Sequence, residues 1–153
     1  MSLSHRRNFY LHFSIVLILL VTLTSFSTQP FDLTNDVLTY TNKFRQSKKL
    51  SPLIIRDDLN AIAKKHSQEM ANGKTDFGHD GFNKRQKQVE KIFKSCSVAE
   101  NVAYGTIDGK EAVIMWEKSP GHRKNLLGNY KYVGIGVAKD RNGANYYTQI
   151  FVR

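Results

Sequence analysis

Two alternating segments near the C-terminus constrain the fold of this chain most strongly. Residues 132–139 (YVGIGVAK) and 145–152 (NYYTQIFV) have the composition of strands, and the loop between them contains Asn142-Gly143. The sequence therefore predicts an antiparallel hairpin. The preceding segments follow the period of helices and do not alternate with strands in the way that a parallel sheet requires. This order favours an α+β domain with a mainly antiparallel sheet.

Four helices are expected before the hairpin. Leu33, Val37, Tyr40 and Phe44 form an apolar stripe that predicts the first helix, with Thr34 as its N-cap. The second starts at Asp57 or Asp58 and ends at Gly73, and His66 lies on its apolar face. The third covers 84–93, with Val89, Ile92 and Phe93 on the buried side. The fourth covers 110–118 and is stopped by Pro120. Segments 53–55 and 98–103 predict an extended stretch and a further strand.

The N-terminal segment is typical of a secretory signal. Arg6 and Arg7 precede an apolar run, and small polar residues then lead to a cleavage site after Ser27. An uncleaved membrane anchor is the alternative, because residues 9–26 approach the roughly 20 needed to span a bilayer. We assign residues 1–28 to this signal and 33–153 to one domain. The remaining length of about 125 residues suits a single core.

Charge and cysteine content limit the classes of partner and fold. The formal charge of +10 favours anionic envelope polymers or lipid headgroups. The basic residues are scattered rather than interleaved with aromatic residues, so a solvated face is expected and nucleic acid is not. Cys96 is the only cysteine. An exported chain with one cysteine forms no internal disulfide, so the fold depends on packing, and this pattern is more typical of bacterial export products.

The candidate site consists of two histidines and one carboxylate. His79 lies in GHDGF, Glu100 in AENVAYG and His122 in WEKSPGHRKNLL. Neutral imidazoles suit zinc and similar ions, but the spacing matches no metal-binding motif. The alternative is that both histidines are packed and hydrogen-bonded and that Glu100 accepts backbone amides. Glu100 could also orient a histidine, because a carboxylate in an apolar strand needs a partner.

Six segments in this order resemble the CAP superfamily, which comprises cysteine-rich secretory proteins, antigen 5 and pathogenesis-related-1 proteins. They are NKFR at 42–45, Leu53 with the following DxL, GHDGF, AENVAYG, WxxSPGHRxNLL, and VGIGVA with YYTQIF. The chain is most similar to the short, disulfide-free bacterial branch. The resemblance implies a three-layer α-β-α sandwich (CAP/SCP-like) and a cleft on one face. Within it, Asn42 and Arg45 are expected to stabilise the fold.

The family's cleft has two histidines and two glutamates. The resemblance places the first three of these groups on His79, Glu100 and His122, and the position of the second glutamate is Ser119. It also implies that His79 and His122 can hold a divalent metal ion such as zinc, which is not obligatory. Any mechanism that needs paired carboxylates is in doubt.

Three functions follow as hypotheses. The first is a secreted, monomeric, non-catalytic module that binds an unknown ligand or partner through His79, Glu100, Ser119 and His122. The second is a metal-dependent extracellular peptidase in which Glu100 is the general base. The third is a basic protein that binds lipid or an anionic envelope component, with membrane contact otherwise limited to the N-terminal segment. Four tyrosines, at 130, 132, 146 and 147, could contact a ligand, although alternate residues of two strands supply the core first.

Overall fold

The computed structural model describes residues 32–153, which form five helices and four strands. The helices are α1 (Leu33–Ser47), α2 (Asp57–Ala71), α3 (Phe82–Ile92), α4 (Gly109–Lys118) and α5 (Pro120–Leu126), and the strands are β1 (Ile54–Ile55), β2 (Val98–Tyr104), β3 (Tyr132–Lys139) and β4 (Asn145–Val152). The predicted signal at 1–28 lies outside these residues. Within residues 32–153, no helix is both long enough and apolar enough to cross a membrane.

The four strands form one mixed sheet in the order β1-β3-β4-β2. The predicted hairpin is present: β3 and β4 are antiparallel, with Tyr132 opposite Val152 and Lys139 opposite Asn145. β2 is antiparallel to β4 and forms one edge, and the two-residue β1 runs parallel to β3 at the other. The sheet is therefore mainly antiparallel, as expected, with one parallel pair.

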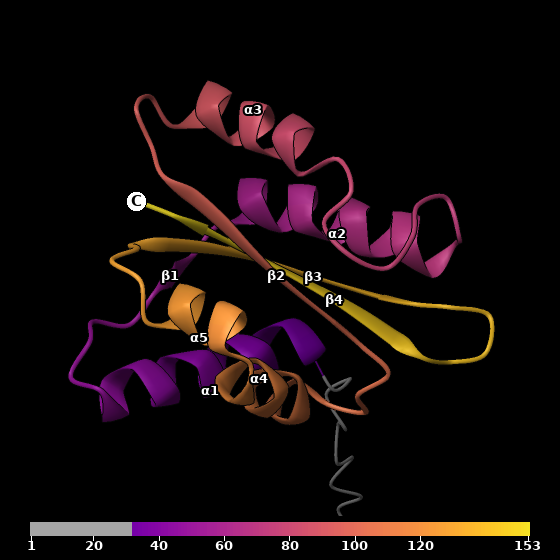
Figure 1. The fold of residues 1–153 in the computed structure, drawn as a ribbon, viewed down its shortest axis with the longest axis horizontal. Helices are drawn as coiled ribbons and strands as arrows, with labels where there is room; N and C mark the ends of the chain where they lie inside the picture. Colours follow the sequence, from indigo (N-terminus) through magenta and orange to yellow (C-terminus); the bar gives the residue numbers. More distant parts are fainter. Residues whose placement is uncertain (1–31) are drawn as a thin grey trace, which may run out of the picture. The chain divides into compact units, whose positions relative to one another are not determined.

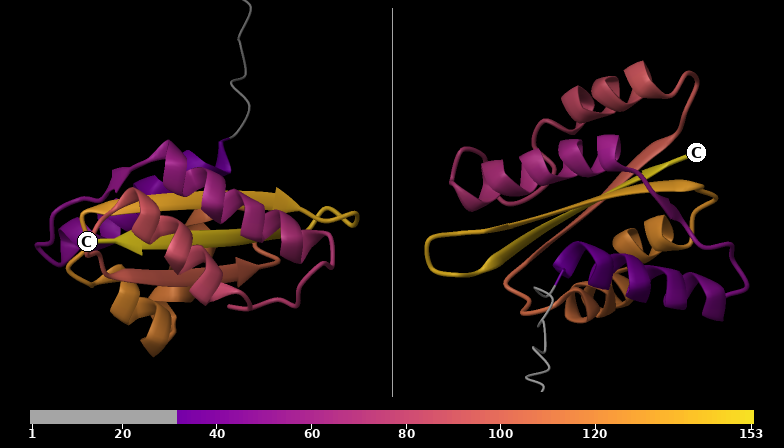
Figure 2. Two further views of the ribbon diagram at one scale, coloured as in Figure 1. Left: turned by 90° about the horizontal axis from the view of Figure 1, so that it is seen from above. Right: turned by 180° about the vertical axis from the view of Figure 1, so that it is seen from behind.

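Helices cover both faces of the sheet and form the three layers shown in Figure 1 and, from two further directions, in Figure 2. On one side, α2 packs on β3 and β4, and α3 packs on α2 and β2; on the other side lie α1, α4 and α5. Alternation along β4 separates two cores. Tyr147 and Phe151 join the core under α1, α4 and α5, whereas Ile150 and Val152 join the core under α2 and α3. The α-β-α sandwich is confirmed.

Two glycines allow α2 to lie directly on the sheet. A Cβ atom at Gly134 would collide with Leu59, and one at Gly136 would collide with the backbone of Ala63 and Lys64. Any side chain at these positions would push the helix away from β3. The strand segment VGIGVA is thus shaped for close approach of a helix backbone.

Three local predictions need correction. The N-cap of α1 is Asp32, whose side chain accepts from Thr34 N, because the carboxylate lies two residues before that amide. Pro120 does not simply end α4: it occupies the first turn of α5, where its missing N–H costs nothing. Ile92, expected on the buried side of α3, is 40% exposed because the helix ends there.

Asn42 and Arg45 stabilise the fold, as expected. Asn42 pairs with both backbone groups of Leu53, donating from Nδ2 to the carbonyl at 3.1 Å and accepting at Oδ1 from the amide at 2.7 Å. The Arg45 guanidinium donates to the carbonyls of Leu126 and Gly128 at 2.8 and 2.9 Å, and to Ser51. These contacts hold α1 to the segment that follows it and to the C-terminal end of α5.

Candidate functional site

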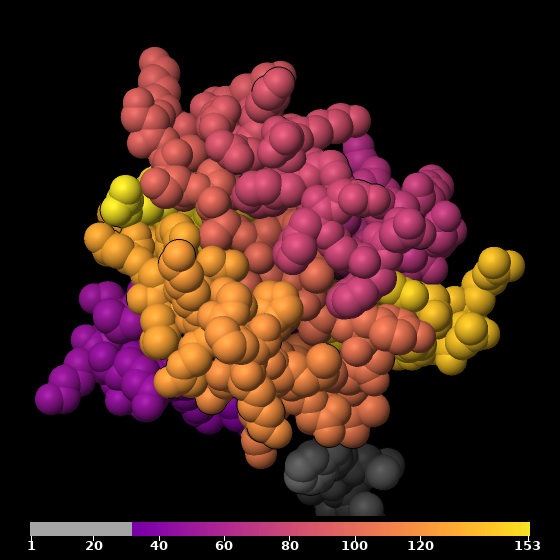
Figure 3. Space-filling view, in the orientation of Figure 1, coloured from indigo at the N-terminus to yellow at the C-terminus, as the bar shows by residue number. Residues whose placement is uncertain are grey.

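The candidate site lies along the edge strand β2, between the two helical layers. Figure 3 shows the surface of α5 (orange) and that of the segment before α3 (pink) facing each other beside β2. Because side chains of a strand alternate, Glu100 points toward α3, and Asn101 points toward α5. The histidines come from the two segments that flank β2, His79 from the loop before α3 and His122 from α5.

Glu100 is buried and fully engaged. Its side chain is 1% exposed, and its two oxygens accept from Arg85, Oε2 from Nε at 2.6 Å and Oε1 from Nη2 at 2.7 Å. Oε1 also contacts Nδ1 of His79 at 2.9 Å. A carboxylate of this kind only accepts, so Nδ1 of His79 carries the hydrogen and Nε2 is left free to face outward. Glu100 therefore orients His79, which is one of the roles the sequence left open.

Arg85 is the site residue that sequence reasoning missed. Besides holding Glu100, it donates from Nη1 to the carbonyl of Asp80 at 2.7 Å, and from Nη2 to that of His79 at 3.4 Å. It thus fixes both the carboxylate and the loop that carries His79. The available signal was its position four residues before Val89 on the buried side of α3, where a cation requires a partner.

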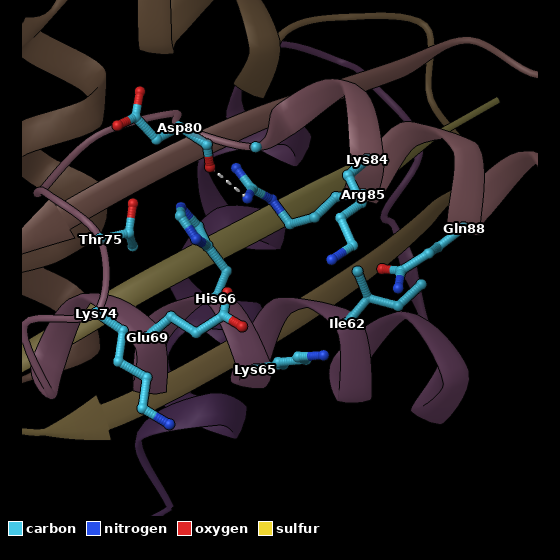
Figure 4. Close-up of a pocket in the computed structure, with 11 residues that line it drawn as sticks. Ile62, Lys65, His66, Glu69, Lys74, Thr75, Asp80, Lys84, Arg85 and Gln88 are labelled. Carbon is cyan, nitrogen blue, oxygen red and sulfur yellow. Dashed lines mark hydrogen bonds between the residues drawn. The ribbon is translucent and has the colours of Figure 1, made fainter.

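His66 supports the same loop from α2. It is buried, as predicted, and Nε2 donates to the carbonyl of Gly78 at 2.9 Å. Figure 4 shows its imidazole pointing from α2 toward Asp80 and the Arg85 guanidinium. Burial lowers the pKa of His66; the bond to Gly78 raises it, and the charge of Arg85 lowers it further. The neutral ring is therefore a positioning group for the segment that contains His79.

α5 and α4 cover the outer edge of β2. Asn125 donates from Nδ2 to the carbonyl of Glu100 at 3.1 Å and to Oδ1 of Asn101 at 2.9 Å. Trp116, buried in the core as expected, donates from Nε1 to the carbonyl of Val102 at 2.8 Å. These bonds satisfy carbonyls on the edge of β2 that would otherwise be available for pairing with another strand. Asn125 thus holds α5, and with it His122, against the site.

The two imidazoles come close together. The ring centroids of His79 and His122 are 6.4 Å apart and the planes are inclined by 47°. The His79 side chain is 50% exposed and His122 is half-buried. Burial lowers the pKa of His122, and a charge on nearby His79 lowers it further. His122 is therefore neutral near pH 7 and can accept or donate a hydrogen bond.

Ser119 lies at the junction of α4 and α5, one helical turn before His122. Its backbone ends α4 and its carbonyl accepts from Arg123 N at 2.8 Å. The Ser119 side chain makes no hydrogen bond within residues 32–153, and nothing in those contacts links it to the two imidazoles. At this position the chain offers a small hydroxyl instead of a second carboxylate.

The donor set fits a metal ion poorly. In the part of the chain that the structure describes, no three His, Cys, Asp or Glu side chains are placed to hold one. Both oxygens of Glu100 and Nδ1 of His79 are already bonded, which leaves one imidazole nitrogen of His79 and the ring of His122. Catalytic zinc sites use three protein ligands and structural sites use four. Two imidazoles alone do not complete either kind.

A shallow pocket of about 260 Å³ lies next to His79. Phe82, Val98 and Ala99 form an apolar wall, and His79, Glu100 and Asn125 supply the polar groups. Pockets that combine an apolar wall with a few placed polar groups are typical of small-ligand sites. The arrangement can bind a group with a small apolar part next to a hydrogen-bonding group.

Solved structures with this architecture include bacterial surface and extracellular proteins. An extracellular protein containing an SCP domain from Bacillus anthracis has a TM-score of 0.68 and 29% identity over 78% of this chain and 40% of that one. An outer surface protein from Borrelia burgdorferi has a TM-score of 0.68 over 80% of this chain and 95% of that one, and at 22% identity it shows the fold alone.

Sequence comparison leads to the same family. The protein YkwD of Bacillus subtilis is 32% identical over 120 residues, which cover 76% of this chain and 45% of the relative; the membrane protein YlbC is 34% identical over 122 residues, 76% and 33% respectively. The chain thus spans less than half the length of these curated relatives. The model of the cysteine-rich secretory protein family matches residues 38–151. The chain belongs to this family, the CAP family.

Proposed function

We propose that this protein is an exported, monomeric, non-catalytic CAP domain that binds a ligand through the cleft of His79, Glu100 and His122, and that Ser119, at the family's fourth cleft position, contributes to the same surface. Export is supported by the signal-like N-terminal sequence and by similarity to a Bacillus anthracis protein described as extracellular. The binding role is supported by the pocket beside His79 and by the free Nε2 of that residue.

The state of Glu100 carries the non-catalytic part of the proposal. A general base needs an unshared oxygen within reach of the proton that it removes. Both oxygens of Glu100 instead accept from Arg85, and one also accepts from His79. With a side chain 1% exposed, Glu100 acts as a structural anchor for the imidazole. The imidazoles are the groups that can contact a ligand.

The test is a fragment screen followed by NMR of the imidazole resonances. Small fragments that combine an apolar group with a hydrogen-bonding group should shift the signals of both His79 and His122. The same fragments should not bind the His79→Ala/His122→Ala variant, and no fragment, ester or peptide should be turned over. Fragments that bind elsewhere, and leave both histidines unchanged, would contradict the proposal.

The metal-dependent peptidase is the competing function. It predicts chelator-sensitive cleavage of a peptide library that is lost in Glu100→Gln. We expect no cleavage with zinc present. We also expect that zinc, titrated alone by calorimetry, binds weakly and only when His79 and His122 are both intact, because two imidazoles fall short of a three-ligand site. Tight zinc binding together with peptide cleavage would favour the peptidase over the non-catalytic binding module.

One observation favours the third candidate, binding to an anionic envelope or lipid component. A second pocket, of about 280 Å³, lies between α2 and α3, and Lys65, Lys74 and Lys84 line it together with Glu69 and Asp80 (Figure 4). None of the three lysines forms an ion pair within residues 32–153. Binding to vesicles of anionic lipid that falls steeply with salt would support this function. Salt-independent binding would exclude the charge as its cause.

A further inference from the structure

An exposed group of three aromatic rings lies beside the loop before α3 and the C-terminal end of β2. We define the aromatic platform as Phe77, Tyr104 and Tyr146. Their ring centroids are 4.6 Å apart for the two tyrosines, and 6.0 and 6.4 Å from Phe77 to Tyr104 and Tyr146. Phe77 is 53% exposed and Tyr104 is 46% exposed. Contiguous exposed aromatic side chains of this kind mark binding surfaces more often than isolated ones do.

The strand register explains why these rings lie together. Tyr104 and Tyr146 are directly opposite each other on β2 and β4. They are at the end of the sheet, where the loop between α2 and α3 brings Phe77 over them. The next residue of β4, Tyr147, points the other way into the core. Two adjacent tyrosines of β4 are thus divided: Tyr147 supplies the core and Tyr146 the platform.

A polar pocket adjoins the platform. It has a volume of about 410 Å³, and Asn72, Asp140, Arg141, Asn142 and Tyr146 contribute to its walls. Oδ1 of Asp140 accepts from the amides of Asn142 and Ala144 in the hairpin turn. Oδ2 of Asp140 and the side chains of Asn72, Arg141 and Asn142 make no hydrogen bond to any residue of 32–153. The pocket therefore presents amide, carboxylate and guanidinium groups that are free to bind hydroxyls.

The geometry points to a glycan as the occupant: we propose that the aromatic platform and the adjoining pocket bind a short stretch of a neutral polysaccharide. A sugar ring has an apolar face of C–H groups and a rim of hydroxyls. The three aromatic planes are inclined to one another by 48–63°, so one sugar ring can pack its C–H face against one exposed ring, Phe77 or Tyr104, while its hydroxyls reach the pocket. A purely apolar side chain would gain from the rings alone and would leave the polar groups of the pocket without partners. Tyr146 belongs to both surfaces and joins them.

This inference does not depend on the function proposed for the imidazole cleft. Phe77 is two residues from His79, and Tyr104 is four residues from Glu100 along β2, so the two sites are neighbours with no residue in common. The His79→Ala/His122→Ala variant should bind glycan as the unchanged protein does. Loss of ligand binding in the cleft and loss of glycan binding can therefore be told apart.

The experiment is calorimetric titration of the full chain with cellotetraose and with chitotetraose, two uncharged glycans, together with an uncharged peptide of similar length. We expect glycan binding with a Kd in the millimolar range or tighter. Tyr104→Ala should weaken it roughly tenfold and Tyr104→Phe should not, because stacking needs the ring rather than the hydroxyl. Asn142→Ala should weaken it by a smaller factor, since one polar partner is lost.

Ile107→Ala is the matched control, because Ile107 is 75% exposed and apolar but has no place in the platform. Its affinity for glycan should equal that of the unchanged protein. Thermal unfolding of each variant confirms that it is folded before binding is compared. The proposal is overturned if neither glycan binds, if only the peptide binds, or if Ile107→Ala and Tyr104→Ala weaken binding equally.

Discussion

Two buried arginines, one on each side of the sheet, differ in the groups that accept their hydrogen bonds. Arg45 in α1 is 2% exposed and donates only to backbone carbonyls, among them those of Leu126 and Gly128. Burial lowers the pKa of Arg45. Arg85 in α3 is paired with the carboxylate of Glu100 and also holds the loop before α3. Arg45 therefore connects α1 to neighbouring backbone segments, whereas Arg85 forms an ion pair at the centre of the site.

The two arginines show that the role of a buried cation can be inferred from the groups that accept its hydrogen bonds. A guanidinium that meets only carbonyls has no charged partner to orient, so its role ends with the fold. A guanidinium that meets a carboxylate also determines which face of that carboxylate remains open. In this protein Arg85 leaves Glu100 no free oxygen, and the carboxylate therefore serves the adjacent His79.

Arg85→Met should have the largest effect. It leaves the buried Glu100 carboxylate without its cation, which costs about 3–5 kcal/mol of unfolding free energy. Urea denaturation measures this loss, and NMR should show displaced His79 imidazole resonances. The double variant Arg85→Met/Glu100→Met should be more stable than Arg85→Met alone, because no unpaired charge remains. If the two substitutions are simply additive, the pairing does not have the role assigned here.

Arg45→Met should destabilise the protein by about 2–3 kcal/mol, because several buried carbonyls lose a charged donor. No carboxylate is left unpaired, so the loss should be smaller than in Arg85→Met. Urea denaturation gives the free energy. The His79 resonances should remain unchanged, since Arg45 donates to Ser51, to Leu126 at the end of α5 and to Gly128, and does not contact the loop that carries His79. Shifts as large as those in Arg85→Met would erase the distinction between the two arginines.

Acidification should destabilise the site side of the sheet. The pKa values of His66 and His122 are lowered in the folded state, so the unfolded chain binds more protons as the pH falls. The unfolding free energy should be constant above the usual histidine pKa of about 6.5 and should decrease below it. His66→Gln should flatten this decrease more than His122→Gln, because His66 is the more buried ring. A stability that rises on acidification would contradict the prediction.

Asn125→Ala should have the smallest effect, about 1 kcal/mol, because it removes the donor to Glu100 O and Asn101 Oδ1. Its consequence for the cleft should be larger than for stability: α5 loses a tie to β2, and His122 should become more mobile in NMR relaxation. Asn129→Ala is the control, since Asn129 is exposed and makes no side-chain hydrogen bond within the described domain. Equal effects of the two variants would leave Asn125 without a positioning role.

Sequence patterns predicted correctly those helices and strands whose apolar residues follow a regular local spacing. The hairpin with Asn142-Gly143 at its turn is present, and α2 begins at Asp57 and ends just before Gly73. The predicted boundaries were wrong where one residue has two structural roles. Pro120 both ends one helix and starts the next, and only the path of the chain after Gly121 decides between them. The parallel pairing of β1 with β3 is non-local and leaves no local signal.

Periodicity in the amino-acid sequence predicted an α+β domain with a mainly antiparallel sheet, because the spacing of apolar residues is a property of each segment. The order of the motifs, through the resemblance to the CAP family, implied the α-β-α sandwich and singled out His79, Glu100 and His122 as candidate site residues. Only the tertiary structure decided what these groups can do. Arg85 meets Glu100 across 15 positions, and Phe77 meets Tyr104 and Tyr146 across loop, strand and hairpin. Such contacts depend on strand register and helix placement, which arise from packing over the whole domain rather than from any one segment.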